Sequence, residues 1–208
     1  WIGDGFADCE DQAYGCDLTC YDNDAGDCAD GGGTDGGGEE PIELSIELNQ
    51  GSNLTSFSVL PEDNSVENVL SSLGYNVVGL SGEGEAALNT ENGWVGSLTT
   101  ILYENGYWLL VNEEVVLNLL GIPIQPDQLY ALHTGNNLIS YSLFECGDIV
   151  EVLPDEMADC IYAIAGEGVA AINTAGGWVG SLTSLCPNEG YWFVNQCDDI
   201  GFRFELFD

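Results

Sequence analysis

The sequence of 208 residues predicts a mainly β protein in which two similar β-rich domains, each with one short helix, follow a small cysteine-rich module. Three observations lead to this prediction. Four of the eight cysteines lie in the first 30 residues, most of the remaining chain is an internal duplication, and both copies are rich in β-branched and aromatic residues separated by Gly and Asn turns.

The domain boundaries follow from composition and from the repeat. Residues 31–40 read GGGTDGGGEE, a composition typical of a flexible linker, and they separate a module at residues 1–30 from the rest. Residues 82–108 and 166–192 align without a gap at an offset of 84 positions, and 17 of their 27 residues are identical. The expected β domains are copy 1, residues 41–124, and copy 2, residues 125–208.

Copy 1 begins with two expected strands. Residues 42–48 alternate apolar and polar side chains, which is the period-two pattern of a half-buried strand. The pattern resumes over residues 54–60 after a turn at Gln50-Gly51, so a hairpin is the simplest interpretation of this region.

A short helix and further strands complete the copy. Asn64 or Ser65, followed by Glu67, can cap a helix that runs through Leu73 and ends at Gly74. Three more segments have the composition of strands and are separated by Gly and Asn turns: residues 75–80, the segment around residues 94–95, and residues 107–111.

The charge of the chain excludes several functions. It has 36 Asp and Glu residues, one Arg, one His and no Lys, so its net charge is −35. Binding to nucleic acids or anionic membranes needs Lys and Arg to neutralise phosphates, and we expect neither as a partner. A lysine Schiff base, a P-loop lysine and an arginine clamp cannot be built either. A cationic partner is favoured instead.

The composition indicates a folded protein outside the cell. A hydrophobic content of 45%, with five Trp, nine Tyr and seven Phe, is enough for a core despite the charge. Eight Cys favour disulfides, and therefore an extracellular or cell-surface location. No apolar run approaches the roughly 18 residues that cross a bilayer, so we expect no membrane insertion. Because the chain begins at Trp1 rather than Met, we expect that any signal peptide, or further upstream sequence, has been removed or lies outside this sequence.

The first 28 residues contain the most specific signal. Cysteines lie at positions 9, 16, 20 and 28, with six, three and seven residues between them. Disulfides can hold such a chain in a tight loop that gathers carboxylates, and the gathering requires a hard cation such as Ca²⁺. Zn²⁺ is disfavoured because its structural sites use CxxC pairs, and an acidic disulfide knot without metal is the other alternative. The candidate calcium ligands are Asp4, Asp8, Asp17, Asp22, Asp24 and Asp27.

The spacing in this segment carries a family resemblance. GCDLTC at residues 15–20, followed by DAGDC at residues 24–28, resembles the Notch-type repeat (LNR), whose CDxxC and DGGDC pattern folds around one calcium ion. The opening WIGDG is similar to versions of this module in exported bacterial surface proteins. The resemblance implies that Asp17, Asp24 and Asp27 bind calcium. The segment departs from the usual form in having four Cys rather than six, and an Ala where a Gly is common.

The two copies carry a second, less specific resemblance. With GxNLIS near the start, a Trp in the middle and GYW near the end, they resemble a small β domain that is repeated in exported, multi-domain bacterial proteins. This resemblance implies a surface location and no particular chemistry.

The aromatic residues that recur in both copies allow two interpretations. They could form a sugar-stacking platform, but their identical spacing within apolar strands favours core anchors. These residues are Trp94, Tyr107 and Trp108 in copy 1, and Trp178, Tyr191 and Trp192 in copy 2.

Four polar residues are candidate catalytic groups. Glu83 and Glu167 lie in matching Gly-Glu-Gly segments and could form the carboxylate pair of a glycoside hydrolase, but the glycines favour a bulge or a tight turn. His133 stands where copy 1 has Asn49, and Arg203 lies on the last strand. We expect His133 and Arg203 to make local hydrogen bonds or salt bridges rather than to catalyse a reaction.

The remaining cysteines occur only in copy 2, where we expect them to add bonds to the basic fold. They are Cys146, Cys160, Cys186 and Cys197. If residues 191–196 form one extended strand, Cys186 and Cys197 are much farther apart than the Cα distance of roughly 4.4–6.8 Å that a disulfide allows. That pairing and its complement, Cys146 with Cys160, are therefore the least expected, and the other pairings stay open.

Two functions fit these features. The first is a secreted structural or surface protein, a subunit of an extracellular fibre or array stabilised by calcium and disulfides, whose partners are copies of itself in head-to-tail contact. The strands at residues 42–48 and 202–206 could each complete the open sheet edge of a neighbour. The alternative is an adhesive module that recognises a glycan or a cell-surface partner through its aromatic residues. No catalytic set is recognisable, and we expect no enzyme activity.

Overall fold

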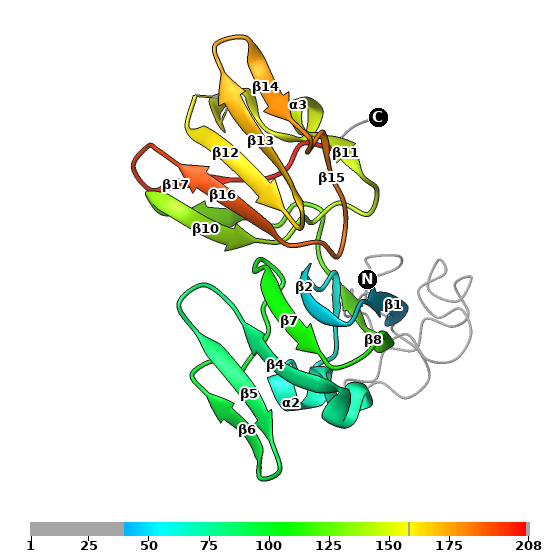
Figure 1. The fold of residues 1–208 in the computed structure, drawn as a ribbon. Coiled ribbons are helices and arrows are strands. Elements are labelled where there is room, and N and C mark those ends of the chain that lie inside the picture. Colours follow the sequence, from blue (N-terminus) through cyan, green and yellow to red (C-terminus); the bar gives the residue numbers. More distant parts are fainter. Residues whose placement is uncertain (1–39, 158, 207–208) are drawn as a thin grey trace, which may run out of the picture. The chain divides into compact units, whose positions relative to one another are not determined.

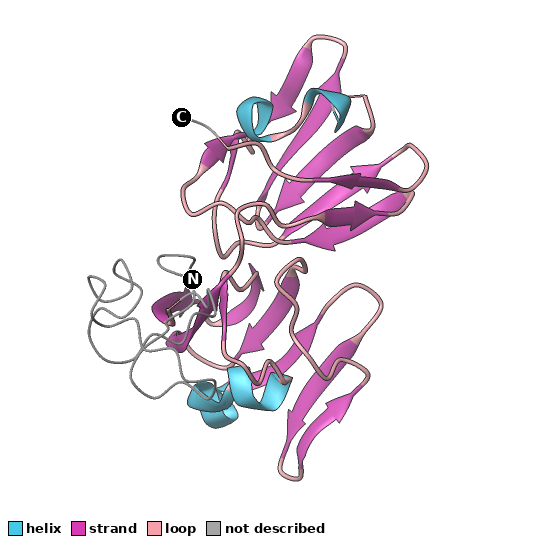
Figure 2. Ribbon diagram, turned by 180° about the vertical axis from the view of Figure 1, so that it is seen from behind, coloured by secondary structure: helices cyan, strands magenta, loops and turns pink. Residues whose placement is uncertain are grey.

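A computed structural model describes residues 40–157 and 159–206 of the chain. The chain separates into two units, Trp1–Glu39 and Glu40–Asp208, and the described residues belong to the second unit (Figure 1). Strands account for 49% of the structure and helices for 10%, so the predicted mainly β fold is confirmed (Figure 2). The expected cysteine module and nearly all of the glycine linker lie outside the described residues.

Copy 1 is built on a five-stranded antiparallel sheet. Its order is β2-β7-β4-β5-β6, so β6 forms one edge of the sheet. One face covers the core, since β7 buries Tyr107, Leu109 and Val111 while Leu110 between them is exposed. The strands are β2 (Gly51–Thr55), β4 (Val77–Ser81), β5 (Ala86–Thr90), β6 (Gly93–Gly96) and β7 (Tyr107–Val111).

Copy 2 repeats this sheet with the equivalent order β10-β16-β12-β13-β14. Even an irregularity recurs, because the register shifts between Val77 and Gly79 in β4 and between Ile161 and Ala163 in β12. The sequence repeat is therefore a structural repeat. The strands are β10 (Gly135–Ile139), β12 (Ile161–Gly166), β13 (Val169–Thr174), β14 (Gly177–Gly180) and β16 (Tyr191–Asn195).

Smaller sheets flank the two main ones. In copy 1 the order is β1-β8-β3, and in copy 2 there are two pairs, β9 with β17 and β11 with β15. Their strands are β1 (Ile42–Leu48), β3 (Val59–Leu60), β8 (Val115–Pro123), β9 (Tyr130–Leu132), β11 (Gly147–Asp148), β15 (Ser184–Leu185) and β17 (Ile200–Phe202).

The expected hairpin at the start of copy 1 is wrong. β1 pairs with β8, with Ile46 opposite Leu117, whereas β2 pairs with β7 and β3 pairs with β8. The physical reason lies in burial, because residues 53–60 are all buried and thus lack the solvent face of an outer hairpin strand. Asn53 fixes the turn between β1 and β2 through its side chain, which binds both the N–H and the C=O of Asn49 at 2.8 Å.

The expected helix is present but shorter. α2 (Val66–Val69) begins at the predicted cap, where the Ser65 hydroxyl accepts a hydrogen bond from the N–H of Asn68, and a 3-10 segment, η1 (Ser71–Asn76), follows. Copy 2 has α3 (Ile149–Val152), capped by Asp148, and the 3-10 segment η2 (Asp155–Met157). No helix in residues 40–157 and 159–206 is long and apolar enough to cross a membrane.

Each copy has its own hydrophobic core. In copy 2 the core includes an aromatic cluster in which the rings of Tyr130, Phe202 and Phe204 contact one another at centroid distances of 5.1 to 5.4 Å. Phe202 and Phe204 are buried, and β17 already pairs with β9. Residues 202–206 therefore already contribute to the core and to a sheet of copy 2, and their pairing with a neighbour stays a prediction.

Two disulfides close loops in copy 2. Cys146 is bonded to Cys186 and Cys160 to Cys197. The predicted exclusion of Cys186 with Cys197 is confirmed, since β16 runs between these two residues as an extended strand. Two sets of pairings are compatible with the sequence, and the structure contains the one that joins Cys146 to Cys186 and Cys160 to Cys197.

Candidate functional site

The most distinctive site in the described residues is the seam, the set of contacts that copy 1 makes with copy 2 through residues 54–58, 104–106, 138–140 and 188–190. Isolated β-bridges join Thr55 to Glu189 and Asn105 to Ile139. Thr55 of copy 1 is equivalent to Ile139 of copy 2, and Asn105 of copy 1 is equivalent to Glu189 of copy 2. The two bridges therefore join equivalent pairs of residues, with the roles of the two copies exchanged. The seam is therefore approximately two-fold symmetric, like the isologous interface of a homodimer.

Main-chain hydrogen bonds repeat this reciprocity. The N–H of Gly106 donates to the carbonyl oxygen of Leu138 at 3.1 Å, and the equivalent Gly190 donates to Leu54 at 3.3 Å. Ser140 donates to Glu104 and Ser56 donates to Asn188, both at 3.0 Å. The two copies are thus joined by four main-chain bonds that form two equivalent pairs.

Glycine is required at the centre of the seam. A Cβ atom on Gly106 would lie 2.8 Å from the carbonyl oxygen of Ile139 and 3.2 Å from the Cα atom of Gly190. A Cβ atom on Gly190 would lie 2.8 Å from the carbonyl oxygen of Thr55. The glycine of each Gly-Tyr-Trp motif therefore allows the two main chains to approach.

A carboxylate from each copy completes the seam. Glu83 accepts a hydrogen bond from the N–H of Leu138 at 3.0 Å, and Glu167 accepts one from the N–H of Leu54 at 2.8 Å. The expected tight turn is confirmed, because Gly84 and Gly168 have φ values of +75° and +71°. Glu83 and Glu167 each bind a strand of the other copy, so both are joining residues of the seam.

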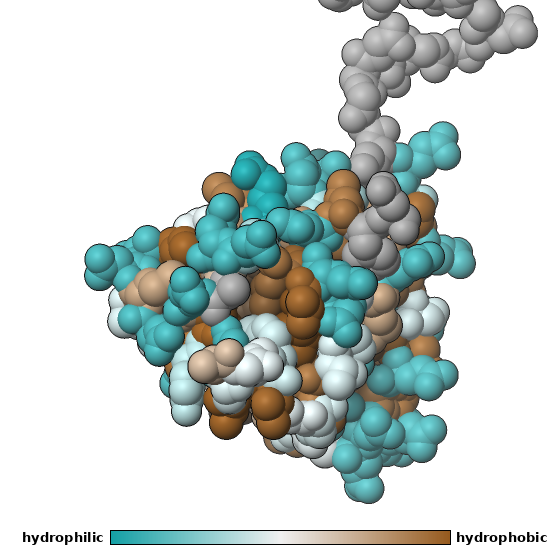
Figure 3. All heavy atoms as spheres, turned by 90° about the horizontal axis from the view of Figure 1, so that it is seen from above, coloured by the Kyte–Doolittle hydropathy of each residue, from teal (hydrophilic) through white to brown (hydrophobic). Residues whose placement is uncertain are grey.

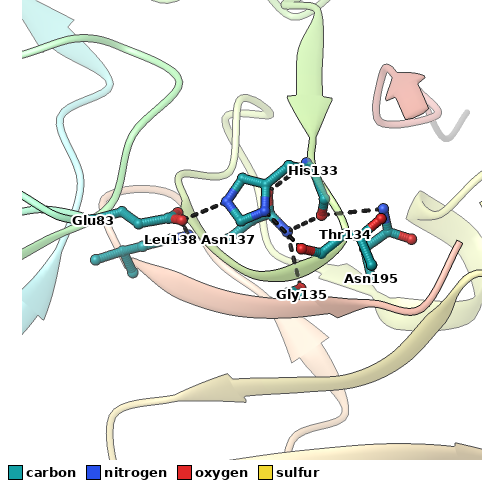
Figure 4. A network of polar contacts seen from close by, with 7 residues as sticks. All are labelled: Glu83, His133, Thr134, Gly135, Asn137, Leu138 and Asn195. Carbon is teal, nitrogen blue, oxygen red and sulfur yellow. Dashed lines mark hydrogen bonds and ion pairs between the residues drawn. The ribbon is translucent and has the colours of Figure 1, made fainter. Parts of the chain in front are cut away.

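His133 makes the two halves of the seam unequal (Figure 4). Its Nε2 atom lies 2.5 Å from Oε1 of Glu83, and its Nδ1 atom lies 2.9 Å from the carbonyl oxygen of Thr134. The Thr134 carbonyl first, and then Glu83, raise the pKa of His133 by favouring the protonated ring. The expectation of a local salt bridge at His133 is confirmed. Arg203 also makes a local contact, with its Nε atom donating to the carbonyl oxygen of Asp127 at 2.8 Å.

The other half of the seam has a cavity where this ion pair would lie. Its volume is about 540 Å³, and its polar lining includes Asn49, the counterpart of His133, and Glu167, the counterpart of Glu83. Asn188 also lines it, in a left-handed conformation with φ of +63°, and its side chain accepts hydrogen bonds from the N–H and hydroxyl of Ser58. The remaining lining residues are Ser45, Ile46, Glu47, Leu48, Asn53, Leu54, Thr55, Val169, Pro187 and Glu189.

The recurring aromatic residues are divided between the two faces of each sheet. Tyr107 and Tyr191 are fully buried, and their hydroxyls accept hydrogen bonds from the N–H groups of Leu102 and Cys186. Burial raises the pKa of Tyr107 to about 12, so its hydroxyl stays protonated. The residues that follow these tyrosines, Trp108 and Trp192, are half-buried on the opposite face, whereas Trp94 and Trp178 pack against the cores.

The aromatic residues therefore do not form a single platform, and the core interpretation holds for the tyrosines and for the two tryptophans that pack against the cores. Sequence reasoning missed the seam as a site. The matching Gly-Glu-Gly and Gly-Tyr-Trp segments were its only sequence signal, and they did not reveal that each copy contacts the other.

The expected calcium ligands, Asp4, Asp8, Asp17, Asp22, Asp24 and Asp27, all lie outside the described residues. Within residues 40–157 and 159–206, no group of three or more His, Cys, Asp or Glu side chains could hold a metal ion. Comparisons with protein-family models, with curated proteins and with solved structures found no match.

Proposed function

We propose that the chain is a secreted structural or surface protein, a subunit of an extracellular fibre or array that is built from copies of itself. The observation that supports this proposal is an apolar strip that occurs on the outer face of both main sheets and ends at an open strand edge. The occupant that fits such a strip is the same strip of a second copy.

The strip is defined by strand register. In copy 1, Val95 lies opposite Leu88 and Leu88 lies opposite Gly79, which lies opposite Leu110. The exposed fractions of Val95 and Leu88 are 61% and 58%. The equivalent strip of copy 2 consists of Val179, Ile172, Ala163 and Val194, with Val179 63% and Ile172 44% exposed. In the view from above, hydrophobic side chains (brown) lie exposed among hydrophilic ones (Figure 3).

Each strip ends at a strand without the usual protection of an edge. β6 and β14 both read Gly-Trp-Val-Gly, and each is the last strand of its sheet. Natural edge strands are commonly protected by charged side chains, Pro or bulges, because an open edge pairs with other chains. Neither β6 nor β14 contains a charge or a Pro, which supports a role for both edges in assembly.

Two equivalent strips on one subunit lead to an open-ended assembly. In Figure 1 the β5–β6 and β13–β14 hairpins lie at opposite ends of the second unit. A subunit that contacts a neighbour at each of two opposite ends builds a chain, unless the rotation between subunits closes a ring. The internal two-fold of the seam is thus the geometric basis for a fibre.

The charge of the chain sets a condition for assembly. The net charge of −35 opposes contact between copies, and screening reduces this repulsion beyond a Debye length of about 10 Å at 0.1 M salt. Calcium, which we expect the first 30 residues to bind, would lower the charge further. The disulfides of copy 2 support the extracellular setting.

Electron microscopy of the native chain with calcium tests this proposal. Ordered fibres that disassemble in EDTA are expected, and the double variant Val95→Glu/Val179→Glu should abolish them by placing charge in both strips. Leu120→Glu is the matched control, because Leu120 is 61% exposed on β8, outside the strips, and its replacement adds a charge. A monodisperse monomer at high concentration with calcium present would reject the proposal.

One observation favours the alternative of an adhesive module. Trp108 and Trp192 recur on the outer faces, beside the strips, where a ligand could stack on them. A glycan that binds the native chain and is lost in Trp108→Ala without unfolding would favour this function over the structural one.

A further inference from the structure

We propose that the cavity beside Glu167 binds an organic cation through a primary ammonium group. This inference goes beyond the structural function proposed above and does not depend on it. It rests on a comparison of the two halves of the seam, in which equivalent main-chain positions carry His133 in one half and Asn49 in the other.

The main chain is held in the same way in both halves. The amide side chain of Asn53 binds the N–H and C=O of Asn49, both at 2.8 Å. The equivalent Asn137 binds the N–H and C=O of His133 at 2.8 and 2.9 Å. The main chain at residues 49 and 133 is therefore held by the same contacts. Each of these residues lies beside a glutamate of the other copy.

The side chains at these positions give the halves different charges. In one half His133 reaches Glu83 and supplies a group that carries a positive charge when protonated (Figure 4). In the other half the shorter and neutral Asn49 takes its place, and the cavity of about 540 Å³ opens beside Glu167. The imidazole of His133 thus shows which kind of group the second carboxylate would accept.

The lining of the cavity fits a cation with an apolar stem. It contains three carboxylates, from Glu47, Glu167 and Glu189, and no Lys, Arg or His. Glu189 already accepts a hydrogen bond from the Tyr191 hydroxyl at 2.6 Å, and Glu167 accepts one from Leu54. Apolar side chains, among them Val169, form other parts of the wall and would contact methylene groups.

The size and spacing of the lining groups argue for an organic ion. Cavities of roughly 300–1,000 Å³ are typical of ligand sites, and this cavity lies within that range. The carboxylates of the cavity are not gathered closely enough to form a metal site. A primary ammonium donates three hydrogen bonds, which suits separate carboxylate and amide acceptors around one cavity.

The experiment is a titration of the full chain with n-butylammonium at constant ionic strength, followed by the NMR signals of the Asn53 and Asn188 side-chain amides. Glu167→Gln should weaken binding about tenfold or more, because a charged hydrogen-bond partner is lost. The glutamine carbonyl can still accept from Leu54, so the seam is kept. Tetramethylammonium, which carries the charge but has no N–H donor, should bind much more weakly.

Glu83→Gln is the matched control, since it is the symmetry-equivalent change and alters the net charge equally. It should leave the affinity for n-butylammonium unchanged. Equal weakening by Glu83→Gln and Glu167→Gln would overturn the proposal, because it would show a general attraction of cations to an acidic chain.

Two substitutions at the pseudo-symmetric positions make the test independent of Glu167. Asn49→His should place an imidazole in the cavity and abolish binding. His133→Asn should free the carboxylate of Glu83 and leave n-butylammonium binding beside Glu167 unchanged. Unchanged binding in Asn49→His would overturn the proposal.

The ammonium group has two sources, a free amine or the lysine side chain of another protein. Titration with Nα-acetyl-lysine amide separates them while the variants above test the site itself. Tighter binding than that of n-butylammonium supports a lysine side chain as the natural ligand, and weaker binding supports a free amine.

Discussion

Glu83 and Glu167 each accept a main-chain N–H from the opposite copy, at 3.0 and 2.8 Å, so single side chains carry much of the specificity of the seam. The glycine that follows each of them lies in the left-handed region, which aims the carboxylate across the seam. His133 adds a charged contact to only one of these carboxylates. The two halves of the seam therefore use the same main-chain contacts, and only one of these carboxylates is paired with a histidine.

We predict that His133→Asn lowers stability only at acid to neutral pH. The pKa of His133 is raised in the folded chain, so the stabilising effect is fully present below the unfolded pKa of about 6.5 and is lost as the pH rises through the folded value. The side chains of His133 and Glu83 are 55% and 37% exposed, which limits the effect to below about 1 kcal/mol. Thermal midpoints of the native chain and the variant, measured from pH 5 to pH 9, should converge at the alkaline end.

The control for this experiment is Glu83→Gln, which removes the charge of the partner and keeps an acceptor for Leu138. It should reduce the same pH dependence. A difference between the native chain and His133→Asn that grows towards pH 9 would contradict the assigned role of the ion pair.

At the scale of elements, the disulfides are the feature that separates copy 2 from copy 1. Cys160 and Cys197 lie 37 residues apart in the sequence, and Cys146 and Cys186 lie 40 residues apart. Both bonds restrict the unfolded chain by closing loops of nearly equal length. Copy 1 forms the same sheet order without any disulfide, so the bonds add stability to a fold that the other interactions already specify.

We predict that Cys160→Ser/Cys197→Ser lowers the free energy of unfolding by about 3–4 kcal/mol in urea titrations. The loss reflects the greater freedom of the unfolded chain, which grows slowly with loop length. Cys146→Ser/Cys186→Ser is the matched comparison and should cause nearly the same loss. A twofold or larger difference between the two variants would contradict the loop-closure explanation.

Local patterns predicted the elements better than they predicted the partners of those elements. The alternation in residues 42–48 predicts β1 with its observed bounds, and the helix cap is Ser65, one of the two predicted candidates. The hairpin failed because the pairing of β1 with β8 joins residues about 70 positions apart, and alternation describes one strand at a time. The contacts of the seam could not be predicted for the same reason, since Glu83 accepts a hydrogen bond from the main chain of Leu138 in the other copy.

At the scale of the whole molecule, the duplication produces one subunit with an internal two-fold. The seam buries equivalent surfaces of both copies, and the same two-fold leaves equivalent apolar strips at the two hairpin ends. In the proposed function, these two strips are the contacts of an open-ended assembly.

Open-ended assembly is tested by sedimentation velocity of Val179→Glu, in which one of the two strips is blocked, with calcium present and over a range of concentrations. The native chain should form polymers that lengthen with concentration. Blocking one strip leaves one free strip per molecule, so Val179→Glu should stop at dimers, and Val95→Glu/Val179→Glu should remain monomeric. Polymers of undiminished length in Val179→Glu, or a native chain that stays monomeric, would contradict the account.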